Sequence, residues 1–157
     1  MVPKYGYQMN RMSLLLLVFI SLLSACKVKK EPSKLAQLEW LLGNWKGTVA
    51  EQPFYERWEK VSNTEFKNIN YKLTASNDTI PDSRSRLVYT DNKIVYFGDD
   101  FSIDASSVTD REVIFENKTR GEKITFTLNE KNEWVATLEY EKEHVVYTLT
   151  KLAPGEK

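Results

Sequence analysis

The chain has 157 residues, of which 41% are hydrophobic and 28% charged, and its formal net charge is zero. This length predicts a single domain, and the composition excludes intrinsic disorder over most of the chain. A net charge near zero argues against nucleic-acid binding, which needs a concentrated basic surface.

The first 25 residues have the composition of an export signal. Lys4 and Arg11 supply positive charge, and an apolar run follows at residues 13–25. This run is too short to cross a bilayer, which takes about 20 residues, but it suits the core of a signal peptide. It ends in Leu23-Ser24-Ala25-Cys26, which resembles the lipobox of bacterial lipoproteins. The resemblance implies removal of residues 1–25 and lipidation of Cys26.

Residues 26–33 are expected to form the lipidated, polar tether of the protein. The residue after Cys26 is Lys27 and not the Asp that retains some lipoproteins at the inner membrane. We therefore expect attachment through Cys26 to the outer membrane, facing the periplasm. An ordinary secretory signal or a short membrane anchor with an incidental Cys is the alternative, and translation could begin at Met1 or at Met12.

A short helix is predicted from about Lys34 to Leu42. Leucines recur at residues 35, 38, 41 and 42, which places them on one helical face. Gly43 is suited to end the helix, since glycine tolerates the left-handed backbone found there.

After Gly43 the hydrophobic pattern changes to a period of two, which is typical of β-strands. The alternation is clear at residues 87–89, 94–96, 113–117, 123–128, 134–140 and 145–150. Polar turns separate these runs at residues 76–78, 91–92, 98–100, 109–110, 120–121, 129–132 and 141–143. The pattern predicts an all-β domain at residues 34–157, with roughly ten strands in an antiparallel meander. A closed barrel would leave no exposed edges, and a sandwich is the alternative architecture.

The segment from Leu38 to Gly47 contains Gly43-x-Trp45, which is similar to the Gly-x-Trp of the first strand in lipocalins and fatty-acid-binding proteins. The wider pattern resembles a bacterial lipocalin-like family of unknown function, through Glu56-Arg57-Trp58 and Phe115-Glu116-Asn117. The resemblance implies a lipocalin-like barrel whose end is closed by the helix and Trp45. The family's His-Asp-Phe-Pro stretch is replaced here by residues 118–122.

The same opening is similar to that of nitrobindin-type haem barrels. Haem needs an axial ligand, which is usually His, and the only His is His144, in a charged turn before the last strand. We therefore expect a solvated His144 and no cofactor.

Glu56 and Trp58 share one strand face by the period of two. In one interpretation Glu56 points into the barrel and orients the polar end of a ligand, while Trp58 supplies an apolar wall. In the other, Glu56 pairs with a cross-strand Lys or Arg and Trp58 is core.

Aromatic and amide side chains at strand spacing could line the same cavity. The remaining candidate ligand-binding residues are Tyr71, Tyr89, Tyr96, Phe115, Asn117, Phe126, Trp134 and Tyr147. A fully packed aromatic core is the alternative.

No nucleophile elbow or phosphate loop is present, and Asp99-Asp100 suits a turn better than a metal site. We therefore expect neither catalysis nor a bound metal. The expected function is capture of a small apolar or amphipathic molecule inside a membrane-anchored barrel. The alternative is a filled barrel that binds another envelope protein, as an inhibitor or assembly factor.

Overall fold

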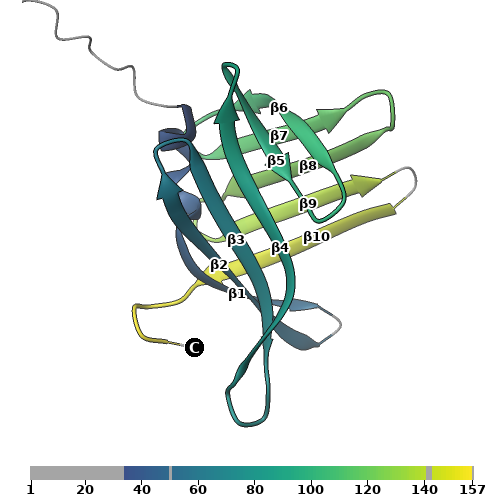
Figure 1. Ribbon diagram of the computed structural model, residues 1–157. Coiled ribbons are helices and arrows are strands. Elements are labelled where there is room, and N and C mark those ends of the chain that lie inside the picture. The colour runs from purple at the N-terminus through teal and green to yellow at the C-terminus, as the bar shows by residue number, and fades with distance from the viewer. Residues whose placement is uncertain (1–33, 50, 141–142, 157) are drawn as a thin grey trace, which may run out of the picture. The chain divides into compact units, whose positions relative to one another are not determined.

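Figure 1 shows the computed structural model, which describes residues 34–49, 51–140 and 143–156. The predicted signal at 1–25, Cys26 and the tether at 26–33 lie outside the described residues, so those predictions stay predictions. Within the described ranges, no helix has both the length and the apolar character needed to cross a bilayer.

A single short 3-10 helix, η1 (Lys34–Leu41), precedes ten strands in the described part of the chain. The strands are β1 (Gly43–Val49), β2 (Gln52–Ser62), β3 (Glu65–Leu73), β4 (Thr79–Thr90), β5 (Lys93–Phe97), β6 (Ser102–Val108), β7 (Glu112–Asn117), β8 (Glu122–Leu128), β9 (Trp134–Tyr140) and β10 (Glu143–Lys151).

Each strand pairs antiparallel with its sequence neighbours, and β10 pairs with β1, so the sheet closes into a barrel. The predicted all-β meander with a short helix before it is confirmed, and the sandwich alternative is wrong. The seam between β1 and β10 is short, with Trp45 opposite Lys151 and Lys46 opposite Thr150. The architecture is consistent with a lipocalin-like barrel.

The helix lies at one end of the barrel, called here the helix end (Figure 1). Because the strands alternate in direction, the connections after β2, β4, β6 and β8 also lie at the helix end. The connections after β1, β3, β5, β7 and β9 lie at the opposite end, called here the open end.

The leucines of η1 match its 3-10 geometry, in which side chains three residues apart are eclipsed. Leu35, Leu38 and Leu41 are fully buried, whereas Leu42, expected on the same face, is only partly buried. Gly43 then has φ of 120°, a conformation that L side chains rarely adopt. The helix therefore ends just before this glycine.

Trp45 connects the helix to the barrel interior. Its Nε1 donates a hydrogen bond to the carbonyl of Leu41 at 2.7 Å, and this pair is buried. Its ring packs edge-on against Trp134 at a centroid distance of 5.8 Å, and the Lys151 ammonium lies 5.0 Å from the ring. Trp45 therefore fills the helix end of the barrel.

Large side chains pack closely in this half of the barrel. Trp58 meets Phe126 and Trp134 edge-on at 6.4 and 6.2 Å, and Phe126 meets Trp134 at 5.2 Å. Phe66 and Leu87 face each other across β3 and β4, and both are almost fully buried. The helix end therefore holds a solid aromatic and aliphatic core.

Replacing Trp45 by Phe is expected to lower the free energy of unfolding by about 2 kcal/mol, measured by urea denaturation. The substitution removes the indole donor and leaves the buried Leu41 carbonyl without this bond. Trp40→Phe is the matched control, because the Trp40 Nε1 is buried and has no hydrogen-bond partner in the described part of the chain. Equal losses in the two variants would contradict the assigned role of the bond.

Candidate functional site

The half of the barrel toward the open end is hollow. It holds a cavity of about 410 Å³, which is within the range of small-molecule sites in proteins. The lining includes Val49 at the end of β1, Asp82 near the start of β4, and Gly98 and Phe101 in the loop between β5 and β6. The cavity therefore reaches solvent between the connections of the open end.

One wall of the cavity is apolar and comes mainly from β8, β9 and β10. Its residues are Phe54, Ile124, Phe126, Trp134, Ala136, Leu138 and Tyr147. Phe54 comes from β2 and packs edge-on against Tyr147 of β10 at 5.5 Å, which extends this wall past β1 to β2. Such a surface binds flat or aliphatic groups through burial of apolar area.

The opposite wall is polar and comes from β2, β3, β4 and β5. Its residues are Glu56, Asn68, Asn70, Ser83, Ser85 and Tyr96. A cavity with one apolar and one polar wall suits an amphipathic molecule, because each part of such a molecule meets a matching surface.

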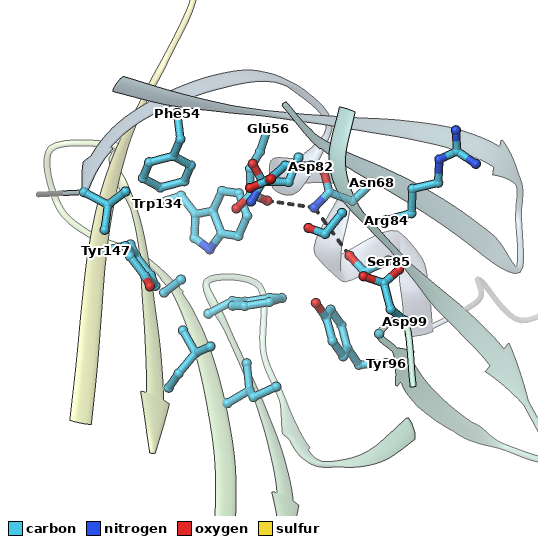
Figure 2. A pocket seen from close by; sticks show the side chains of 18 of the residues that line it. Phe54, Glu56, Asn68, Asp82, Arg84, Ser85, Tyr96, Asp99, Trp134 and Tyr147 are labelled. Carbon is cyan, nitrogen blue, oxygen red and sulfur yellow. Dashed lines mark hydrogen bonds between the residues drawn. The ribbon is translucent and has the colours of Figure 1, made fainter. Parts of the chain in front are cut away.

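Three of these polar side chains form a chain of hydrogen bonds across β2, β3 and β4 (Figure 2). Asn68 Nδ2 donates to Glu56 Oε2 at 2.8 Å and, more weakly, to Ser85 Oγ at 3.4 Å. The carboxylate and the hydroxyl thus fix the orientation of the Asn68 amide. Its Oδ1 is buried and has no hydrogen-bond partner among the described residues.

Glu56 lies deep in the barrel, but its side chain keeps some exposed surface, which faces the cavity. Burial raises the pKa of Glu56 from 4.5 to about 7, because the interior disfavours the charged form. The Asn68 amide and, to a smaller extent, the Trp58 indole oppose this rise. Trp58 Nε1 makes no hydrogen bond of normal geometry among the described residues, so the Asn68 amide is the main group that opposes the rise.

Tyr96 continues the polar wall onto β5. Burial raises the pKa of Tyr96 to about 12, the Ser85 hydroxyl opposes this, and the charges of Glu56 and Asp99 add to it. Tyr96 therefore stays a neutral phenol at physiological pH. Figure 2 shows its hydroxyl on the side of Ser85 and Asp99.

The structure brings five of the predicted ligand-binding residues into this cavity. They are Glu56, Tyr96, Phe126, Trp134 and Tyr147. Glu56 points inward, and no described Lys or Arg forms an ion pair with it, in contrast to the alternative of a cross-strand salt bridge.

The other five predicted residues do not line the cavity. Trp58 and Phe115 are buried in the core beside it, and Tyr89 packs partly buried against the same core. Asn117 ends β7, where its Oδ1 and its carbonyl accept from the Arg120 N–H at the following turn.

Tyr71 lies on the outer face of β3, where it stacks on Tyr55 at 5.4 Å. The inward residues of β3 are instead Phe66, Asn68 and Asn70. The prediction that Tyr71 faces inward is therefore wrong, because the inner face of β3 is aromatic at Phe66 but polar near the open end.

Sequence reasoning missed Asn68 and Ser85, the two partners of the Glu56 network. Both are inside the barrel, although their polarity suggested the outer face. A register shift in the pairing of β3 with β4 places Asn70 opposite Ser83 and Tyr71 opposite Pro81, so Asp82 is an extra residue. The inward carboxylate of Glu56 was the available indication that a polar partner must lie across from it.

His144 is exposed on β10 and does not line the cavity. Asp99 and Asp100 lie in the loop after β5, as predicted for a turn. Among the described residues, no group of three or more His, Cys, Asp or Glu side chains is placed to hold a metal ion.

The geometry defines a closed antiparallel barrel with a two-sided cavity at one end. Comparisons with protein-family models and with curated proteins gave no match to this chain. The function is therefore inferred from the cavity itself.

Glu56→Gln is expected to remove a pH dependence of stability. Because the folded pKa of Glu56 is about 7 and the unfolded value 4.5, the protonated form favours folding below pH 4.5, and this contribution is lost as pH rises through about 7. As pH rises from 4.5 to about 7, the variant should therefore gain about 2 kcal/mol in free energy of unfolding relative to the unsubstituted chain, with allowance for partial exposure of Glu56. Urea denaturation at both pH values measures it.

Glu59→Gln on the same strand is the matched control. Its exposed carboxylate bonds Lys67, which lowers its pKa, so its loss should give no gain at high pH. A pH profile of Glu56→Gln that is parallel to that of the unsubstituted chain would show that Glu56 ionises normally in the folded state.

Proposed function

We propose that this protein binds a small apolar or amphipathic molecule in the open half of its barrel. The observation that carries the proposal is the cavity of about 410 Å³ with one aromatic and one polar wall. Burial of about 300 Å² of apolar ligand surface would contribute about 7 kcal/mol before ordering costs. Glu56 and its Asn68 partner would fix the orientation of the polar end.

The function we propose is binding and not catalysis, and it needs no cofactor. The support is the composition of the cavity lining, which offers matched surfaces rather than an activated nucleophile beside a base. A lipocalin-like relationship is part of this proposal, and it is supported by the closed barrel and by Gly43-x-Trp45 at the start of β1.

A second candidate function is docking to another envelope protein at the open end. It is favoured by apolar side chains that are exposed on β1, on β4 and in the loop after β5: Val49 at 41%, Ile80 at 54% and Phe101 at 36% exposure. Val49 and Phe101 also line the cavity, so a ligand accounts for part of this exposure.

Ala136→Phe tests the ligand proposal directly. Ala136 lies opposite Phe126 on β8 and Tyr147 on β10, so a phenyl ring there would occupy the cavity. We expect the unsubstituted chain to enhance the fluorescence of N-phenyl-1-naphthylamine and the variant to bind this probe at least about tenfold more weakly.

Thr137→Phe is the control for the preceding experiment. Thr137 is the next residue on β9 and has the opposite orientation, so a ring at this position lies outside the barrel. Circular dichroism verifies that both variants are folded. Equal probe binding by the two variants, or no binding by the unsubstituted chain, would refute the proposal.

We also propose that the protein is held on the periplasmic face of the outer membrane through lipidated Cys26, with the membrane as its partner. The support is Leu23-Ser24-Ala25-Cys26 after an apolar run. Several acyl chains, at about 0.8 kcal/mol per buried methylene, hold a protein firmly.

Cys26→Ser is expected to move the protein from the membrane fraction to the soluble fraction, as measured by immunoblotting after cell fractionation. The serine cannot form the thioether that carries the lipid. Lys27→Ala is the control and should leave the protein in the membrane fraction. Unchanged fractionation of Cys26→Ser would disprove the lipid anchor and leave the barrel's proposed ligand unaffected.

A further inference from the structure

Glu56 is a carboxylate that has no cation beside it among the described residues. Asn68 engages its Oε2 at 2.8 Å, and no described residue hydrogen-bonds to Oε1. No described Lys or Arg forms an ion pair with it, although described residues form nine ion pairs elsewhere. A buried carboxylate normally has a charged or fully hydrogen-bonded partner, so one partner of Glu56 is still to be supplied.

The basic side chains of the cavity lining do not supply a positively charged partner for Glu56. Lys72 is paired with Asp82 at 3.2 Å, and both are half exposed at the mouth. Arg84 is exposed, and Figure 2 shows its guanidinium pointing away from Glu56. With Glu56 and Asp82, Asp99 makes three carboxylates in the lining, against the two cations Lys72 and Arg84. The deep part of the cavity, where Glu56 lies, is therefore complementary to a positive charge.

We infer that the molecule bound here carries a protonated amine on a flat apolar body, with the Glu56 carboxylate as its counter-ion. This inference depends on the proposed ligand-binding function and specifies the chemical class of the ligand. Asn68 holds one carboxylate oxygen and thereby orients the other for the ammonium group. The apolar wall of the cavity, which includes Trp134 and Phe54, receives the flat body of the ligand. The negative faces of these aromatic rings also favour a nearby cation.

The affinity of a neutral ligand is expected to have the opposite dependence on pH. A carbonyl group would need Glu56 to be protonated, so that the carboxylic acid donates a hydrogen bond, and its binding would weaken as pH rises. An ammonium group needs the ionised carboxylate, and its binding tightens as pH rises through the pKa of Glu56 near 7.

The phenols, amides and hydroxyl that face Glu56 do not obscure this pH dependence of binding. Tyr96 on β5 has a pKa of about 12, and burial also raises the pKa of Tyr140 on β9. Asn68 and Asn70 on β3 and Ser85 on β4 are neutral amides and a hydroxyl. Between pH 6 and 8, Glu56 therefore changes its charge while Tyr96 and Tyr140 stay neutral.

The experiment is titration calorimetry of the full chain with three probes that share one ring system: 2-(1-naphthyl)ethylamine, 2-(1-naphthyl)ethanol and 1-naphthaleneacetate. We expect the amine to bind most tightly and the anion most weakly. Between about pH 6 and about pH 8 the amine should gain about tenfold in affinity, because the ionised fraction of Glu56 rises about tenfold. Glu56→Gln should lose at least about tenfold for the amine and nothing for the alcohol.

Glu59→Gln, which removes a carboxylate on the outer face of β2, should bind all three probes as the unsubstituted chain does. Tighter binding of the alcohol or the acetate than of the amine would overturn the inference and leave the ligand-binding function intact. A fall in amine affinity with rising pH would have the same consequence. Failure of all three probes to bind at millimolar concentration would overturn the binding function and the inference together.

Discussion

Every second side chain of a closed antiparallel sheet points into the barrel, whatever its polarity. In this protein that constraint divides the interior into two halves. Toward the helix end the inward residues are large and apolar, and they pack around Trp58 and Trp134. Toward the open end the inward residues of β3 and β4 are amides and hydroxyls such as Asn68 and Ser85, too small to fill the space. The cavity is a consequence of this division.

Glu56 lies between the two halves. It follows Phe54 and precedes Trp58 on the inner face of β2, so the strand places a carboxylate between two buried aromatic rings. The amide of Asn68 offsets only part of the cost of burying that charge, and the pKa of Glu56 rises accordingly. The arrangement destabilises the empty, ionised barrel, which supports the proposal that Glu56 serves binding rather than folding.

The sequence predicted the architecture well, because β7 to β10 alternate regularly between apolar and polar residues and are separated by polar turns. It also placed Glu56 and Trp58 on one face correctly. The prediction for Tyr71 failed where the inner face of β3 is polar, since hydrophobic alternation then indicates the wrong side. The extra residue at Asp82 shifts the phase of β4, and no local pattern in one sequence reveals such a bulge.

The most direct test of ligand capture is a native mass spectrum of the protein purified without denaturation from the cells that produce it. We expect a fraction of molecules heavier by the mass of one small compound, which is released on denaturation and is absent from the Ala136→Phe variant. A spectrum showing only the bare chain, together with a crystal structure in which side chains fill the open half of the barrel, would contradict a binding role.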